Sequence, residues 1–314
     1  MYHPYFRGKQ YELITIRELA PLLEAAGFCP IIEPVREDLS GLQKALDAVV
    51  EVDGRAIVVV NPHHGDLSGA GEPLTELLRD NFLERPGISA GVLLKQNTAL
   101  DKVIEYYEDH AAHAPVLIHA GFSEAKALTE KLGNPTKDHS HIFFEDFCGK
   151  LYQKHFKGAN RILLRDGFKR MRNRDYDLVE PFSDLHATFR DEGMDGFGDF
   201  LIVGDEYSEG GGPAYAITIH LTFIDHDQDD LMQIYHFKSK RTDTPKDPAG
   251  KFAEALAAMM KALDDPKSKV LETDAVKEFR ILDEQGHFPG LGYVKKLSMS
   301  HHIETIADYF KKAT

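Results

Sequence analysis

Eight short apolar runs in this chain end on, or lead directly into, side chains that can bind ligands or transfer protons. One such residue stands at or near the end of each run: Arg7, Glu33, Asn61, Lys95, His119, Glu145, Asp166 and Asp205. Burying so many ionisable groups together is unfavourable unless they pair with one another or bind a ligand. We therefore expect a polar pocket, and a ring of ion pairs that merely stabilises the fold is the alternative.

Five of these residues could carry acid/base chemistry and form the predicted catalytic set: Glu33, Lys95, His119, Glu145 and Asp166. The imidazole of His119 changes charge near neutral pH, which suits a general acid or base, although a hydrogen-bonded core histidine is the alternative. A desolvated Lys95 amine could be a base or a Schiff-base nucleophile, or it could simply neutralise a carboxylate. The carboxylates could instead hold a divalent cation, so Mg²⁺ is the cofactor to consider.

A second set of residues could bind the substrate: Arg7, Asn61, Arg165, Asp184, His186, Gly198, Asp199 and Asp205. The glycines at 196–199 and 209–213 could hold a phosphate through backbone N–H groups, although tight turns explain them equally well. Arg165 opens a basic run that could neutralise such a phosphate. Asp184 and His186 could join histidines further along in a metal site, but no HExxH motif supports one and the metal ligands stay unknown.

Composition narrows the function classes. The chain has 314 residues and a formal net charge of −14, which argues against a broad nucleic-acid-binding surface. Only Cys29 and Cys148 are present, as expected for a reducing compartment without a disulfide framework. Because we find no signal-peptide pattern and no apolar run of about 20 residues, we expect a cytoplasmic protein without a membrane span.

The apolar runs recur roughly every 25–35 residues, the size of a βα unit. They cover residues 3–7, 29–35, 56–62, 87–95, 115–121, 140–146, 161–167 and 199–205. Seven of them are nearly continuous aliphatic stretches, which is typical of parallel strands buried on both faces. The repeat predicts an α/β fold, a (β/α)₈ TIM-type barrel whose strand ends would gather the polar residues at one mouth. An open doubly wound sheet is the alternative, but no GxGxxG follows the first run.

The second half of the chain departs from this repeat. No amphipathic helix follows the seventh run, and residues 214–225 and 231–237 alternate apolar and polar side chains, which predicts an antiparallel β-hairpin. We expect a barrel over residues 1–266, with a hairpin insertion at 206–241 and a closing helix at 249–263. Residues 267–314 should form a C-terminal helical appendage packed on the barrel.

Several stretches have a distinctive amino-acid sequence: MYHPYFRGKQYELITIREL at 1–19, EPFSDLHATF at 180–189, GMDGFGDF at 193–200 and GGPAYAITIHLTF at 211–223. In these stretches the chain resembles a bacterial family of uncharacterised proteins grouped with the phage "beta protein". The resemblance implies a barrel-like fold and an association with mobile elements or phage defence. It implies no established activity and no catalytic residue.

The sequence thus predicts a barrel enzyme that acts by acid/base hydrolysis or transfer on a phosphorylated or nucleotide-like small substrate. The alternative is a non-catalytic barrel that binds a protein partner or a signal ligand through an aromatic-rich surface at residues 182–215. Either function requires the strand ends, or the loops beyond them, to present their side chains on one face.

Overall fold

The computed structural model describes residues 1–133, 135–210 and 214–313. Contacts within the chain divide it into two units, of which the first comprises residues 1–166 and 188–200. The second comprises residues 167–187 and 201–314. Each unit has a hydrophobic core of its own.

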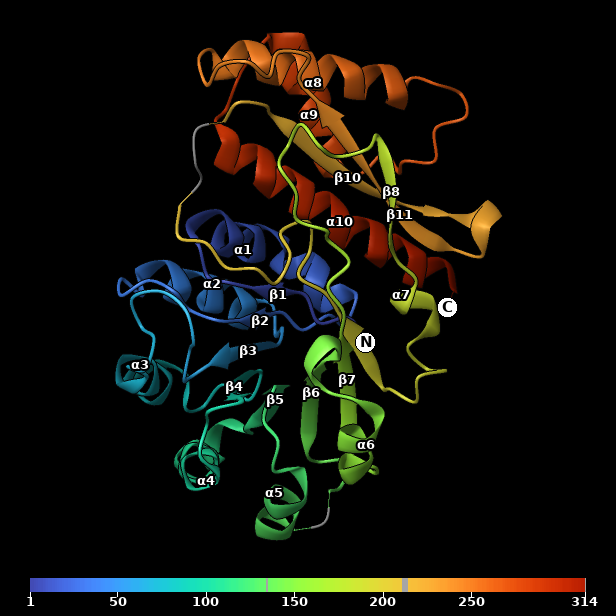
Figure 1. The fold of residues 1–314 in the computed structure, drawn as a ribbon. Helices are drawn as coiled ribbons and strands as arrows, with labels where there is room; N and C mark the ends of the chain where they lie inside the picture. The colour runs from blue at the N-terminus through green and yellow to red at the C-terminus, as the bar shows by residue number, and fades with distance from the viewer. Residues whose placement is uncertain (134, 211–213, 314) are drawn as a thin grey trace. The chain divides into compact units, whose positions relative to one another are not determined.

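The first unit is an α/β structure built on a nearly closed, barrel-shaped sheet of eight parallel strands (Figure 1). The strands pair in the order β1 (Tyr5–Phe6), β2 (Ile31–Ile32), β3 (Ala56–Val59), β4 (Ile88–Lys95), β5 (Val116–Ala120), β6 (Ser140–Phe144), β7 (Asn160–Leu164) and β9 (Gly196–Gly198). The last strand returns to the start of the chain, where Tyr2 bridges to Phe197 and the His3 amide donates to the Phe197 carbonyl at 2.8 Å. The predicted barrel-like α/β class is confirmed.

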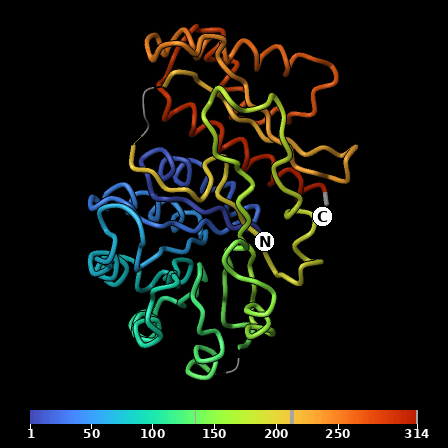
Figure 2. Tube along the Cα trace, viewed as in Figure 1, coloured from blue at the N-terminus to red at the C-terminus, as the bar shows by residue number. Residues whose placement is uncertain are grey.

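Helices follow the strands of this unit, as the helical periodicity of the intervening segments predicts. They are α1 (Gln10–Ala25), α2 (Ser40–Glu51), α3 (Glu72–Phe82), α4 (Leu100–Asp109), α5 (Ala125–Leu132) and α6 (Lys150–Gln153). Helix α2 shows the expected amphipathic pattern, because it buries Leu42, Leu46 and Val49 on one face. The coils of these helices follow one another along the trace, from its blue start into its green part (Figure 2).

Alternate residues of the strands fill the inside of the sheet. Tyr5, Ile31, Val59 and Leu93 belong to one buried cluster with residues from β5, β6 and β7. Burying an aliphatic or aromatic side chain of this size contributes about 1.5–3 kcal/mol, so this inner cluster is a main source of stability for the unit. Because side chains alternate along a strand, the residue two positions further on faces the same way.

The eighth barrel strand is Gly196–Gly198. The sequence predicted it at residues 199–205, which was wrong because the strand ends directly before that segment. A Cβ added at Gly198 would collide with the His3 carbonyl oxygen and the Leu164 side chain, so only glycine permits this close strand approach. The apolar residues that suggested a strand, from Phe200 to Ile202, are buried in a turn in which Leu201 has φ 53°. Asp205 therefore does not follow a barrel strand.

The second unit is a three-stranded antiparallel sheet with helices. The sheet has the order β10 (Thr218–Asp225), β11 (Leu231–Lys238) and β8 (Val179–Ser183), and the helices are α7 (Leu185–Thr188), α8 (Pro248–Leu263), α9 (Asp274–Gln285) and α10 (Leu291–Ala313). The predicted hairpin is β10–β11. Strand β8 was not predicted because it contains Pro181, which is tolerated here since β8 is an edge strand.

Helix α8 packs on the hairpin. Its residues Phe252, Leu256 and Met259 share a core cluster with Ile219 of β10 and Phe237 of β11. These contacts place α8 in the second unit, with the hairpin and the C-terminal helices. The sequence had instead suggested that this helix closes the barrel and that the barrel domain ends at residue 266. No helix in the described part of the chain is long and apolar enough to cross a membrane.

Candidate active site

Four consecutive barrel strands carry a polar residue two positions beyond an inward-facing core residue. Beyond the core residues Tyr5, Ile31, Val59 and Leu93 stand Arg7, Glu33, Asn61 and Lys95. Strand alternation places these four side chains on the inner side of the sheet, at the carboxyl ends of β1 to β4. We call these four residues the polar layer. In barrel enzymes this end of the strands carries the reacting groups.

Glu33 is the centre of the polar layer and is fully buried. Its Oε2 atom pairs with the Arg7 guanidinium and accepts the Tyr5 hydroxyl at 2.9 Å. Its Oε1 atom accepts the backbone N–H groups of His63 at 2.8 Å and His64 at 3.2 Å. Burial alone would raise the pKa of Glu33, but the Arg7 charge and these hydrogen bonds hold it below its ordinary value. Glu33 is therefore a permanent carboxylate that fixes the loop after β3.

Arg7 is as tightly held as its partner. Its side chain is 6% exposed, and its guanidinium carbon lies 4.9 Å from the centre of the Tyr5 ring and 5.7 Å from that of Phe200. Its backbone N–H donates to the Glu12 carboxylate at 2.6 Å, which ties the start of α1 to the end of β1. The Arg7–Glu33 pair is thus the buried ion pair that the sequence left open as a structural alternative.

Lys95 differs from the other members of the polar layer. Its half-buried ammonium lies 5.3 Å from the centre of the Phe147 ring, and no carboxylate among the described residues lies within ion-pair distance of it. A cation in this position lacks the countercharge that both arginines of the barrel end possess. Lys95 is therefore the residue of the layer best placed to hold an anionic ligand.

His64 adjoins the polar layer, since its backbone N–H donates to Glu33, and it was not among the residues predicted from the sequence. Burial is the main cause that lowers the pKa of His64 to about 4; the charge of Glu33 opposes the shift, and those of Arg7 and Lys95 add to it. At neutral pH its imidazole is therefore uncharged. Its position directly after the third apolar run was the signal available in the sequence.

Asn61 is engaged by the backbone of the neighbouring strand. Its side-chain amide donates to the Leu93 carbonyl oxygen at 2.9 Å, and the Leu93 N–H donates back to the Asn61 Oδ1 atom at 2.7 Å. This double hydrogen bond continues the pairing of β3 and β4 beyond the last strand residue. Asn61 thus supports the polar layer by fixing the position of β4, which carries Lys95.

His119 lies on the other side of the sheet from the polar layer. Its neighbours Ile118 and Ala120 face the inner cluster, so its ring points outward and is fully buried. Its Nδ1 atom lies 2.6 Å from the Tyr152 hydroxyl and its Nε2 atom 2.9 Å from His141 Nδ1. Burial, and then the neighbouring His141, hold the pKa of His119 well below its usual range. It is a hydrogen-bonded core histidine, separated from the other predicted catalytic residues.

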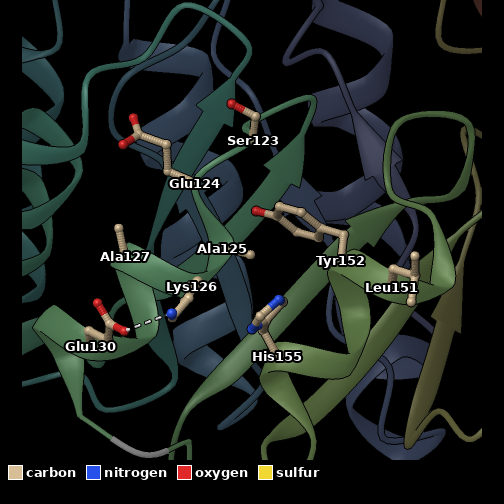
Figure 3. Close-up of a pocket in the computed structure, with 9 residues that line it drawn as sticks. All are labelled: Ser123, Glu124, Ala125, Lys126, Ala127, Glu130, Leu151, Tyr152 and His155. Carbon is tan, nitrogen blue, oxygen red and sulfur yellow. Dashed lines mark ion pairs between the residues drawn. The ribbon is translucent and has the colours of Figure 1, made fainter.

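A surface pocket of about 520 Å³ lies beside this histidine, between α5 and α6. Figure 3 shows Tyr152 and His155 on one side of the pocket, and Lys126 with its ion-pair partner Glu130 on the other. Tyr152 is the link between the pocket and His119. None of the residues predicted from the sequence lines this pocket, so it is distinct from the polar layer.

Glu145 and Arg165 form a forked ion pair at the ends of β6 and β7. The Arg165 Nε atom lies 2.5 Å from Glu145 Oε2, and Nη2 lies 2.9 Å from Oε1. This two-point geometry makes the pair a clamp between neighbouring strands. Arg165 is thus held by a carboxylate of its own unit, and Asp166 follows it two residues beyond the end of β7.

Asp199 and Gly198 belong to the closure of the sheet. The Tyr2 hydroxyl donates to Asp199 Oδ1 at 2.8 Å, and burial followed by the Asp199 charge raises the pKa of Tyr2. Tyr2 also packs edge-on against Phe28, with ring centres 5.1 Å apart. These contacts join β9 to the start of the chain. They give Asp199 and Gly198 a role in closing the sheet that requires no bound substrate.

Asp184, His186 and Asp205 belong to the second unit, whereas the polar layer belongs to the first. His186 is buried in α7 with its ring centre 4.9 Å from that of Tyr309. Across residues 1–133, 135–210 and 214–313, no three His, Cys, Asp or Glu side chains are grouped to hold a metal ion. Because Glu33 and Glu145 are each paired with an arginine, the predicted carboxylate set does not fit a Mg²⁺ site.

Most aromatic residues between 182 and 215 are core residues. Phe182, Phe189 and Phe197 are buried, whereas Tyr215 is 49% exposed. The expected aromatic binding surface is thus largely used for packing. Residues 211–213 of the glycine-rich stretch lie outside the described residues.

Comparison with known proteins identifies no relative of this chain. No family model, no curated protein and no solved structure matches the chain. The resemblance to the phage beta-protein group stays a prediction, and the function has to be argued from the polar layer itself.

Proposed function

We propose that the chain is a barrel enzyme that acts by acid/base hydrolysis or transfer on a small phosphorylated or nucleotide-like substrate at the polar layer. The observation that carries the proposal is Lys95, a cation at the inner end of β4 with no carboxylate partner among the described residues. In a chain of net charge −14, such a cation favours an anionic ligand at this one place. A phosphate would supply the missing countercharge.

His64 would move the proton in this reaction. Its uncharged imidazole would accept a proton from the attacking water or hydroxyl as the new bond from oxygen to phosphorus forms. The same proton would then pass to the leaving oxygen as its bond to phosphorus breaks. Glu33 is a positioning residue in this scheme because its carboxylate holds the His63 and His64 backbone N–H groups.

The proposal is tested with a panel of nucleoside monophosphates, nucleoside diphosphates and sugar phosphates, assayed with and without Mg²⁺. Phosphate release and product mass are measured for the wild type and for Lys95→Met, His64→Gln and Lys44→Met. Lys44 is an exposed lysine of α2 and serves as the matched control.

We expect at least one compound to be converted. Loss of the acid/base group in His64→Gln should slow its conversion about 10²- to 10⁴-fold. Lys95→Met should raise KM strongly, and Lys44→Met should change neither kcat nor KM. A wild type that converts no compound in the panel, or a Lys95→Met variant with unchanged KM, would contradict the proposal.

A further inference from the structure

A cavity of about 210 Å³ lies at the amino-terminal end of the barrel, opposite to the polar layer. Every one of the eight strands contributes to its lining with a residue at or near its start. The space exists because small residues occupy the inward positions there, among them Cys29, Ser89, Ser140 and Gly196. A Cβ added at Gly196 would lie 2.7 Å from the Met1 carbonyl oxygen, so glycine is required there.

His3 gives this cavity an unused hydrogen-bond acceptor. The residue is 6% exposed, and its Nδ1 atom has no hydrogen-bond partner among the described residues. Burial, then the charges of the Met1 ammonium and of Arg55, lower the pKa of His3 to about 3, so the ring is neutral. The Cys29 backbone acts against this shift by hydrogen bonding to the ring. A neutral ring carries one proton, and if it donates to Cys29 through Nε2, Nδ1 is the acceptor. Nδ1 therefore presents a lone pair in a buried place, where an unpaired acceptor is unfavourable.

Arg55 supplies a positive charge to the same cavity. Its Nη2 atom contacts the Met1 sulfur at 3.2 Å and the Gly27 carbonyl oxygen at 3.4 Å, and no described carboxylate pairs with it. The one carboxylate in the lining, Asp195, is neutralised by Lys137 at 2.6 Å, and it accepts the Arg161 backbone N–H at 3.0 Å. An anion beside Arg55 would therefore meet a net positive environment.

Apolar walls complete the cavity. Ile57, Val116 and Ile162 line it and belong to the inner cluster of the barrel. The volume of about 210 Å³ is below the 300 Å³ at which pockets for drug-sized ligands begin, so the cavity suits a smaller molecule.

We propose that this cavity binds a small hydroxy-carboxylate, with its carboxylate on Arg55, its hydroxyl donating to His3 Nδ1 and its hydrocarbon part against Ile57, Val116 and Ile162. The site is separate from the polar layer because it lies at the other end of the strands. A ligand bound there stabilises the folded barrel, since the unfolded chain lacks the cavity.

The test uses two matched pairs of probes, para-hydroxybenzoate with benzoate and lactate with propionate. Affinity is measured by titration calorimetry, and the ring nitrogens of His3 are followed by ¹⁵N NMR. One of the hydroxy-acids should bind about tenfold more tightly than its partner without the hydroxyl, and should shift the His3 Nδ1 signal as that atom gains a hydrogen bond. Arg55→Gln should weaken binding about 10- to 100-fold, whereas Arg17→Gln, an exposed arginine of α1, should leave it unchanged.

Two results would overturn the proposal. The first is equal or absent binding of both members of each pair, together with a His3 signal that does not move, which would mean that water alone occupies the cavity. The second is wild-type affinity in Arg55→Gln. His3→Phe should abolish the hydroxyl preference, and the NMR measurement on the wild type decides the matter should this variant not fold.

Discussion

Glu33→Gln should destabilise the barrel strongly. The substitution removes the charge that compensates Arg7, which is only 6% exposed. It also replaces one acceptor oxygen by an NH₂ group, whose hydrogens then face groups that themselves donate hydrogen bonds to Glu33. Removing one partner of a buried ion pair costs about 3–5 kcal/mol, because the remaining charge stays out of water. We therefore expect the free energy of unfolding of the first unit to fall by about 3–5 kcal/mol.

Hydrogen exchange read by mass spectrometry measures this loss on the barrel strands themselves, which separates them from the second unit. Glu37→Gln changes an exposed carboxylate only four residues away and should alter stability by less than about 0.5 kcal/mol. Replacing both partners, as in Arg7→Met with Glu33→Leu, should recover much of the loss, since no charge is then buried alone. A loss below about 1 kcal/mol in Glu33→Gln would refute the reasoning that the pair is buried and mutually dependent.

The remaining predictions concern pH and packing. His3 and His141 have pKa values of about 3 in the folded chain, because burial favours their neutral form. In the unfolded chain each histidine has its ordinary pKa of about 6.5, so the unfolded state takes up a proton on each residue as the pH falls below that value. The free energy of unfolding therefore decreases between pH 6.5 and pH 3, by up to about 1.4 kcal/mol per pH unit for each histidine. Urea unfolding between pH 7 and 5 checks this, and a flat profile would contradict it. Gly198→Ala should cost about 3 kcal/mol, because the new methyl collides with the His3 carbonyl. Gly210→Ala should be close to neutral in thermal unfolding, because no described atom beyond the adjacent residues lies within 4 Å of the added methyl.

The barrel was predictable because its strands are buried on both faces and their apolar runs recur at a regular distance. The same property hid the direction of each side chain: VLIHA in β5 has no polar alternation, so the outward position of His119 could not be read from it. The eighth strand was misplaced because glycines form it and the more apolar residues next to it form a turn.

The polar layer was partly predictable. Arg7, Glu33, Asn61 and Lys95 follow apolar runs, and strand ends gather at one end of a barrel. What each residue does there depends on neighbours from distant parts of the chain, and no local pattern contains that information. His64 is the clearest case, because its neutral state depends on burial and on the charges of Arg7 and Lys95, and the charge of Glu33 opposes it.

The central claim, that the polar layer binds an anionic substrate through Lys95, is tested most directly by an NMR titration with adenosine monophosphate. The ¹⁵N signals of the lysine ammonium groups and of the histidine rings are followed together. We predict that the signals of Lys95 and His64 shift along one saturable curve while that of Lys44 stays in place. Signals of Lys95 and His64 that remain fixed, or that move no more than that of Lys44, would contradict the claim.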